Sequence, residues 1–352
     1  MRELTIDGVR IDDATDAYVI AEVGHNHGGD LETCKQLFRA AKEAGAHAVK
    51  LQKRDNRSLY TREAYAKAYE NENSFGATYG EHREALELGR REYLALQQYC
   101  KELEIAFFAT AFDIPSADFL AELDVPAYKI ASGDLKTTPL LEHVARIGKP
   151  VILSTGGASL DDVRRAADTI LPLNSQLCVL QCTAGYPAKF EELDLRVIET
   201  FRREFPESVI GLSSHDNGIA MAVAAYLLGA RVIEKHFTMN RAWKGTDHAF
   251  SLEPTGLRKM VRDLERTRVA LGDGVKKVHA SERAPLQKMG KTLVAARALA
   301  AGTVLGPEDV AMKSPGGAGL APYHWDDVIG ATLTAALPED GPITFEVLER
   351  KA

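Results

Sequence analysis

Acidic, basic and imidazole side chains stand directly after two short apolar runs in the second half of the chain. Val232-Ile233 passes into Glu234, Lys235 and His236, and the run VIGLSS at 209–214 is followed by His215. Burying such groups is costly unless each has a partner or a chemical task. Two imidazoles at neighbouring strand ends suit a divalent metal, and two protein ligands leave positions open for water or substrate. The pattern therefore indicates a catalytic metal site.

Polar side chains also follow the other apolar runs of the chain. Lysines and serines are prominent among them, and phosphate or carboxylate groups bind to ammonium, hydroxyl and backbone N–H donors. An anionic ligand is therefore expected beside the metal. The strand-end groups are Glu22, Lys50, Gln52, Asp113, Lys129, Ser132, Ser154, Thr183, Tyr186, Ser213 and Ser214.

Short apolar runs carry these side chains, and helical patterns separate the runs. The runs are apolar on both faces, which is typical of parallel strands covered by helices on both sides. Their number favours a (β/α)8 TIM barrel followed by a smaller domain, and in a barrel the carboxyl ends of all strands gather at one catalytic face. The runs lie at 18–24, 47–52, 105–111, 127–132, 150–155, 177–182, 209–214 and 230–237.

Periodic apolar positions at 31–46 and 160–171 predict two of the intervening helices, with Asp30 and Ser159 as their N-caps. The alternation of strands and helices ends near residue 272, where a polar stretch with Gly and Pro begins. We predict a catalytic barrel at 1–275, a linker at 276–290 and a small β-rich domain at 291–352.

Composition excludes several classes of partner. The 352 residues carry a net charge of −7 without a basic block, so nucleic acid is not an expected partner. No apolar run approaches the ~20 residues of a membrane span. The opening MRELTIDGVRIDD lacks the regions of a signal peptide, and Cys178 and Cys182 fit small core residues. We expect a cytoplasmic protein that does not bind membranes.

Motifs along the chain resemble those of one enzyme family. AEVGHNHGGDLE at 21–32 is similar to the opening of the sialic acid (N-acetylneuraminate) synthase family, and the later motifs follow in that family's order. The end of the chain, with RALAAGTVL and KSPGGAGLAP, resembles the family's antifreeze-like (SAF) domain. The other motifs are VKLQ, YKIASGD, LSTG, CTAGYP, GLSSHDNG and VIEKHFT.

The resemblance implies a condensation. Phosphoenolpyruvate would add through C3 to the aldehyde of an N-acyl-mannosamine-like amino-hexose, giving a nonulosonic (nine-carbon 2-keto) acid and phosphate with the help of Mn²⁺ or Mg²⁺. It also implies a domain-swapped homodimer, in which each last domain covers the partner's site.

The resemblance also implies a role for each strand-end residue. His215 and His236 would hold the metal, while Glu22 would handle protons or the attacking water. Lys50 and Lys129 would be catalytic and would hold phosphoenolpyruvate. The remaining expected substrate-binding residues are Gln52, Ser132, Ser154, Tyr186, Ser213 and Asp247.

The chain departs from the family pattern in two places. Ala184-Gly185 stands where the family commonly has Asn after Cys-Thr, so one ligand amide is absent. Lys313-Ser314 replaces an arginine that reaches a partner's sugar in many relatives, and lysine cannot copy a bidentate guanidinium. The side chain of the last domain that would reach the sugar is therefore open.

Two further segments have more than one interpretation. The loop 54–88 is either a solvated face or a lid that shapes sugar specificity. His25 and His27 form an H-x-H pair that is able to bind metal, although we favour a role for His27 in orienting the loop while Gly28-Gly29 make the turn.

Rival functions also remain at this stage. One is another phosphoenolpyruvate–aldose synthase, of the Kdo or DAHP type, on the same barrel. Another is a pyruvate aldolase that forms a Schiff base on Lys129 or Lys50 and needs no metal. A carbohydrate or ice-surface binder without catalytic activity fits the ionisable rim poorly.

Overall fold

The predicted strands form a closed parallel barrel, which confirms the expected fold class. The computed structural model describes residues 2–349. Neighbouring strands pair in the order β10-β3-β4-β5-β6-β7-β8-β9, so the first and last strands of the barrel close the ring. These strands are β3 (Tyr18–Gly24), β4 (Ala48–Lys53), β5 (Ala106–Ala111), β6 (Tyr128–Ile130), β7 (Val151–Ser154), β8 (Leu177–Cys182), β9 (Val209–Ser214) and β10 (Val232–His236).

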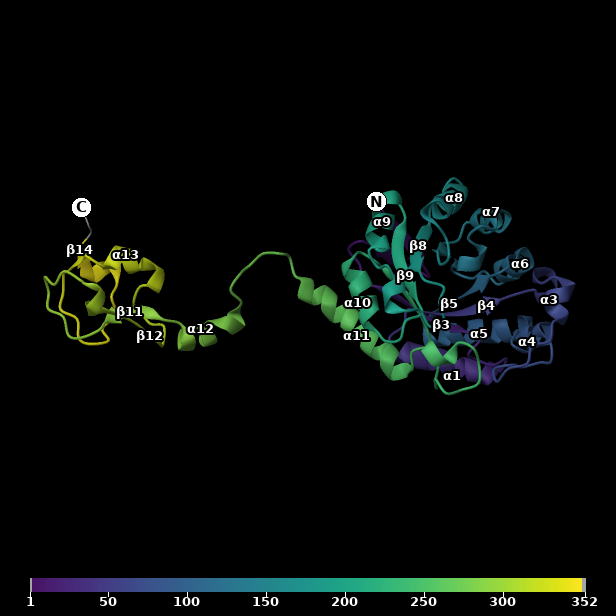
Figure 1. The fold of residues 1–352 in the computed structure, drawn as a ribbon, viewed down its shortest axis with the longest axis horizontal. Coiled ribbons are helices and arrows are strands. Elements are labelled where there is room, and N and C mark those ends of the chain that lie inside the picture. Colours follow the sequence, from purple (N-terminus) through teal and green to yellow (C-terminus); the bar gives the residue numbers. More distant parts are fainter. Residues whose placement is uncertain (1, 350–352) are drawn as a thin grey trace. The chain divides into compact units, whose positions relative to one another are not determined.

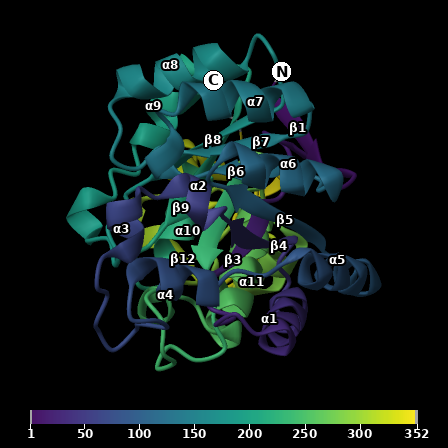
Figure 2. The ribbon, with the colours of Figure 1, turned by 90° about the vertical axis from the view of Figure 1, so that its right-hand side faces the viewer.

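Helices surround the barrel and bury its outer face, as Figures 1 and 2 show. The predicted N-caps are confirmed: Asp30 accepts a hydrogen bond from the Thr33 amide, and Ser159 accepts one from the Asp162 amide. The main helices are α1 (Leu31–Glu43), α5 (Arg90–Leu103), α6 (Ile114–Glu122), α7 (Thr138–Ile147), α8 (Leu160–Ile170), α9 (Val197–Glu204), α10 (Ala220–Leu227) and α11 (Pro254–Leu271).

The register of the strands brings the polar side chains to one level. His236 of β10 lies opposite Glu22 of β3, and Glu22 lies opposite Lys50 of β4. Glu234 lies opposite Ser213 of β9. Because paired residues on adjacent strands point to the same side of a sheet, these groups converge inside the barrel at its carboxyl end.

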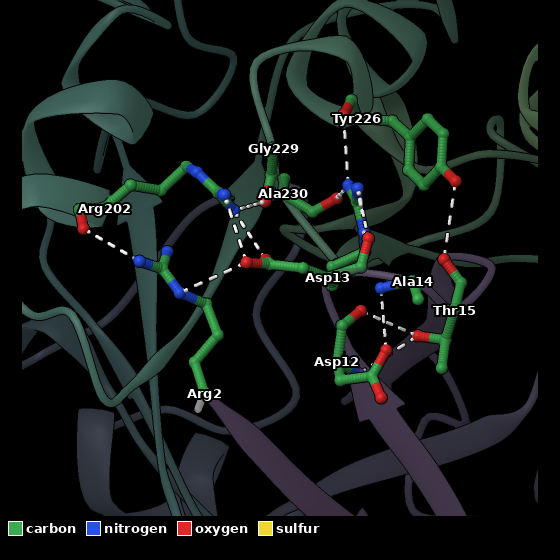
Figure 3. A network of polar contacts seen from close by, with 10 residues as sticks. Arg2, Asp12, Asp13, Ala14, Thr15, Arg202, Tyr226, Gly229 and Ala230 are labelled. Carbon is green, nitrogen blue, oxygen red and sulfur yellow. Dashed lines mark hydrogen bonds and ion pairs between the residues drawn. The ribbon is translucent and has the colours of Figure 1, made fainter. Parts of the chain in front are cut away.

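A short hairpin that the sequence analysis did not foresee precedes the barrel. Its strands are β1 (Glu3–Ile6) and β2 (Val9–Asp12), and Leu4, Ile6 and Ile11 are buried in the core. Figure 3 shows how the following turn is held. Asp13 accepts hydrogen bonds from both terminal nitrogens of Arg202, at 2.7 and 3.2 Å, and forms an ion pair with Arg2.

The chain divides after Gly272 into two compact units, Met1–Gly272 and Asp273–Ala352. The second unit has its own apolar core, which includes Leu293, Leu305 and Ile343. Small antiparallel sheets dominate it, and a helix lies within the expected linker. Its elements are α12 (Arg283–Met289), β11 (Thr292–Ala295), β12 (Val310–Lys313), α13 (Trp325–Val328), β13 (Thr332–Leu333) and β14 (Leu348–Glu349).

Across residues 2–349, none of the helices combines the length and the apolar character that crossing a membrane would require.

Candidate active site

The strand-end side chains line one cavity of about 460 Å³ at the carboxyl end of the barrel. The structure brings all of the predicted site residues together there, although their individual roles stay predictions. They are Glu22, Lys50, Gln52, Lys129, Ser132, Ser154, Tyr186, Ser213, His215, His236 and Asp247. A larger groove of about 680 Å³ is lined by residues such as Thr5, Gln97 and Pro150, near the amino ends of the strands. It contains none of these strand-end groups.

Lys50 lies between two buried carboxylates. Its Nζ is 2.5 Å from Glu22 Oε2 and 3.9 Å from Glu234 Oε2, and it donates a hydrogen bond of 2.8 Å to Thr110 Oγ1. Burial raises the pKa of Glu22, and the charge of Lys50 offsets this only in part. A carboxylate with a raised pKa is a stronger base than an exposed one, which suits proton transfer near neutral pH.

Lys129 makes the second buried ion pair of the cavity. Its Nζ donates to Ser154 Oγ at 2.6 Å and lies 3.5 Å from Glu234 Oε1. Burial lowers the pKa of Lys129, while burial alone would raise that of Glu234. For Glu234 the nearby ammonium groups of Lys129 and Lys50 outweigh burial and hold its pKa well below the usual range. Glu234 therefore stays ionised beside a carboxylate, Glu22, that protonates more easily.

The imidazoles of His215 and His236 face each other with ring centroids 5.3 Å apart. His215 Nδ1 lies 2.9 Å from the Thr183 carbonyl, which fixes the proton on Nδ1 and leaves Nε2 with a free lone pair. His236 Nδ1 is buried without a hydrogen-bond partner among the described residues. Burial lowers the pKa of both rings to about 4, so both are neutral at pH 7.

Neutral imidazoles with free lone pairs are what a divalent metal requires, so the residues present fit the expected ion. Within residues 2–349 no three His, Cys, Asp or Glu side chains are grouped as a complete metal cage. Asp247 Oδ2 is the nearest carboxylate oxygen to this pair, 3.7 Å from His236 Nδ1. Tyr186, which is exposed and also lines the cavity, packs on the His215 ring with the centroids 4.1 Å apart.

Gly24 makes room where three of these side chains meet. Its φ is +55°, and a β-carbon there would lie 3.2 Å from both Gln52 Nε2 and Glu22 Oε1 and 3.5 Å from Asp247 Oδ2. A larger residue would therefore be strained and would displace polar atoms of the cavity. Gln52 Nε2 donates to Glu22 Oε1 at 2.7 Å, which orients this carboxylate toward Lys50.

Serine hydroxyls complete the wall opposite Gln52. Ser213 donates to Glu234 Oε1 at 2.9 Å, and Ser132 Oγ accepts from the Gly156 amide at 2.9 Å. Ala184 also lines the cavity at the position where the sequence departs from the family's Asn. Because the Ser213 proton is already donated to Glu234, an anion in the cavity would meet the Lys129 ammonium and the Ser132 hydroxyl as donors.

The loop 54–88 borders the cavity, which favours the interpretation of a covering segment over that of a solvated face. Its helices are α2 (Asn56–Leu59), α3 (Arg62–Ala66) and α4 (Tyr79–Ala85), and Arg54 and Arg83 line the cavity. The loop role of His27 is confirmed, because its Nδ1 accepts from the Gly29 amide at 3.0 Å and both following glycines have positive φ. His25 instead lines the cavity.

Glu234 and Lys235 are neighbours in the sequence, but only Glu234 lines the cavity. Strand alternation would have separated them, because Glu234 shares a face with His236. Lys235 points away from the cavity and donates to Asp216 Oδ1 at 2.9 Å, with both side chains buried. The contribution of Thr110 carried no comparable signal, because threonine is common in strands.

Comparison with known proteins places the chain among carbohydrate-acid synthases. Residues 37–276 match the model of the NeuB family, and residues 290–349 match the model of the SAF domain. The chain is similar to N-acetylneuraminate-9-phosphate synthase of Homo sapiens, with 39% identity over 332 residues that cover 94% of this chain and 92% of the human protein.

Two further relatives support this similarity. N,N'-diacetyllegionaminic acid synthase of Legionella pneumophila is 35% identical over 338 residues, which cover 94% of each chain. The crystal structure of N-acetylneuraminic acid (sialic acid) synthetase from Leptospira borgpetersenii, in complex with citrate, aligns with a TM-score of 0.70 at 34% identity. That alignment covers 81% of this chain and 95% of the solved one.

Proposed function

Because the chain belongs to the NeuB family, we propose that it condenses phosphoenolpyruvate with an N-acyl-mannosamine-type aldose to give a nonulosonic acid and phosphate, in a metal-dependent reaction. The observation that carries the proposal is the cavity in which the Lys50 and Lys129 ion pairs lie beside the two neutral imidazoles. The relatives named as synthases of neuraminic and legionaminic acids support the reaction class.

Phosphoenolpyruvate carries two anionic groups, a carboxylate and a phosphate, and the cavity offers two buried ammonium groups. Lys129 with Ser154 and the neighbouring hydroxyls would bind one of them, and Lys50 with Thr110 would bind the other. Charge-assisted hydrogen bonds at both ends hold the enol in one orientation with C3 free to react. This fixed orientation is the main contribution that these residues make to the rate.

His215 and His236 would hold the divalent ion, which when bound supplies a Lewis acid that polarises the sugar aldehyde. The Thr183 carbonyl sets the tautomer of His215, and the position of Asp247 beside His236 keeps a carboxylate near the sugar hydroxyls. Tyr186 would pack against the sugar in the cavity.

The bond between C3 of the enol and C1 of the aldehyde forms first and leaves a cation at C2. Water then adds to C2, and phosphate departs by cleavage of the C2–O bond, so the atoms balance as a 2-keto acid plus phosphate. Glu22 would accept the proton of the attacking water, because its raised pKa makes it the better base of the two carboxylates. The ionised Glu234 would stabilise the positive charge at C2.

Phosphate release from phosphoenolpyruvate tests the proposal. We expect release with N-acyl-mannosamines or their phosphates, and its loss in chelator with recovery on adding Mn²⁺ or Mg²⁺. Release with pentose or tetrose phosphates alone would assign a Kdo- or DAHP-type synthase instead. Trapping of pyruvate on Lys129 by borohydride without any metal would assign a Schiff-base aldolase and overturn the proposal.

The cysteines fit the expected cytoplasmic location. Cys34, Cys100, Cys178 and Cys182 are all free and buried, as is usual for proteins of a reducing compartment.

A further inference from the structure

A buried ion pair that the proposed reaction does not use lies next to the two cavity histidines. Lys235 Nζ donates to Asp216 Oδ1 at 2.9 Å and to the backbone carbonyl of Asp216 at 2.7 Å. The hydroxyl of Ser214 donates to the same carboxylate oxygen. These three residues are at most 3% exposed, so the charges are almost completely removed from water.

The ion pair lies on the opposite side of the barrel wall from the cavity. His215 and His236 line the cavity, whereas their neighbours Ser214, Asp216 and Lys235 do not. Because successive residues of an extended chain point to opposite faces, these three neighbours lie on the outer side of the wall, which the helices cover. Burying charged groups there is costly unless they are paired or have a further task.

The contact between Lys235 and Asp216 continues the connection between β9 and β10 past the end of their pairing. The register of the two strands ends with Lys235 opposite Ser214, and His215 is the first residue after β9. Lys235 therefore joins the segment that follows β9 to β10 at the level of the two imidazoles. Because one ammonium group binds both the backbone carbonyl and the carboxylate of Asp216, it fixes the main chain directly after His215.

Other contacts hold His215 to the strand on its other side. Its ring lies 2.9 Å from the Thr183 carbonyl, and the Ala188 amide donates to the His215 carbonyl at 3.2 Å. Both of these partners belong to the loop that follows β8, so they do not set the distance from His215 to His236. Lys235 is the neighbour of His236 on β10, and its bonds to Asp216 connect the two ligand-bearing segments directly.

Stability alone does not explain an ion pair at this place. Apolar side chains of similar size often stabilise a fold as much as a buried ion pair, or more. An ion pair with several directed hydrogen bonds adds a defined position for its partners. Two imidazoles that share a metal ion need such definition, because the side chains of a functional site must be held to within about 0.5 Å.

We propose that Lys235 and Asp216 are positioning residues, which set the spacing of His215 and His236 for a divalent metal ion. They act through the main chain that follows His215, since neither of them lines the cavity. The inference rests on the proposed function, because it takes the two histidines as the ligands of that ion.

Calorimetric titration of Mn²⁺ into the full chain, after removal of metal by chelator, tests the proposal without turnover. Lys235→Met keeps the length of the side chain but removes the ammonium group, and we expect the Kd for Mn²⁺ to rise by about 10- to 100-fold. The single variant also loses stability, because the Asp216 carboxylate stays buried without its cation. The double variant Lys235→Met/Asp216→Asn removes that charge, so it should recover much of the stability in urea unfolding but not the affinity for Mn²⁺.

Two further variants separate positioning from a general loss of stability. Asp216→Asn keeps acceptor oxygens for Lys235 and Ser214, so it should retain most of the affinity for Mn²⁺. The matched control is Lys53→Met, at the end of β4 and outside the cavity, which removes a largely buried lysine 2.8 Å from Glu87 Oε2. This control should lose stability without losing affinity for Mn²⁺.

His215→Ala serves as the reference for any Mn²⁺ that binds away from the two histidines. Weak binding by both Lys235 variants, with an unchanged KM for phosphoenolpyruvate at saturating Mn²⁺, supports the proposal. Wild-type affinity in the double variant would overturn it, as would an equal loss of affinity in Lys53→Met. A wild type that binds Mn²⁺ but releases no phosphate with any sugar would refute the proposed reaction alone, whereas a wild type that binds no divalent ion would overturn the metal site and this inference together.

Discussion

Replacing Lys129 by Met tests whether the buried ammonium group of this lysine stabilises the ionised carboxylate of Glu234. Methionine keeps the length of the side chain but removes the charge, so Glu234 loses the cation 3.5 Å from its Oε1. Breaking a buried ion pair from one side costs about 3–5 kcal/mol in the free energy of unfolding. Glu234 retains Ser213 at 2.9 Å and Lys50 at 3.9 Å, so we expect a loss of about 3 kcal/mol at pH 7.

The stability of the variant should also depend on pH in a new way. In the wild type the pKa of Glu234 is lowered to about 2, so its stabilising contribution is complete above its unfolded value of about 4.3 and is lost only as pH falls toward 2. Without Lys129 the burial of Glu234 raises its pKa. Protonation of Glu234 then removes the unpaired buried charge from the folded state. The difference in the free energy of unfolding between wild type and variant should therefore narrow as pH falls from 7 to 5.

Urea unfolding at several pH values, together with the double variant Lys129→Met/Glu234→Gln, measures both effects. The double variant should recover most of the lost stability and show no narrowing with pH. In activity, Lys129→Met should raise the KM for phosphoenolpyruvate by about 10- to 100-fold or abolish turnover. If the single variant is as stable as wild type at pH 7 and keeps its KM, Glu234 does not depend on Lys129 and the reasoning fails.

Three other changes have definite expected outcomes. His215→Ala or His236→Ala should lose activity by several orders of magnitude and bind no Mn²⁺ in a titration. The control His143→Ala, which lies outside the cavity, should stay active, and full activity of either site variant in chelator would exclude the metal. Glu22→Gln should lower kcat by about 10²–10⁴-fold, and an unchanged pre-steady-state rate of phosphate release would remove Glu22 from proton transfer. Light scattering should show a dimer, and a 1–275 truncation should fold but bind the sugar weakly; a fully active truncation would refute the covering role of the last domain.

Strand ends were predictable from the sequence because a parallel barrel imposes a simple rule on them. The carboxyl ends of all its strands lie at one face, so a polar residue that follows a buried apolar run must lie at that face. Glu22 and His236, which are far apart in the sequence, lie together there as expected. The N-caps of α1 and α8 were equally predictable, since a capping side chain bonds to an amide only three residues away.

Other features of the cavity and the fold depend on tertiary contacts that the spacing of residues in the sequence does not encode. Arg54 lies in the cavity because Phe112, at the end of another strand, provides a face on which its guanidinium stacks. The hairpin of β1 and β2 was not foreseen, because each of its strands has only four residues and the buried positions differ between them. Whether a loop arginine turns inward or toward solvent is decided by such tertiary partners, and a single sequence does not contain them.

The closure of the barrel between β10 and β3 also determines when the fold can be completed during synthesis. The bond from Asn26 to the Phe237 carbonyl joins residues 211 positions apart, and that from Arg2 to the Arg202 carbonyl joins residues 200 apart. The hairpin lacks its anchor until α9 leaves the ribosome, and β3 keeps one unpaired edge until β10 has followed. Nascent chains with such open strand edges are prone to pair with one another. The fraction of chains that fold correctly should therefore depend on how soon β10 is synthesised after β3.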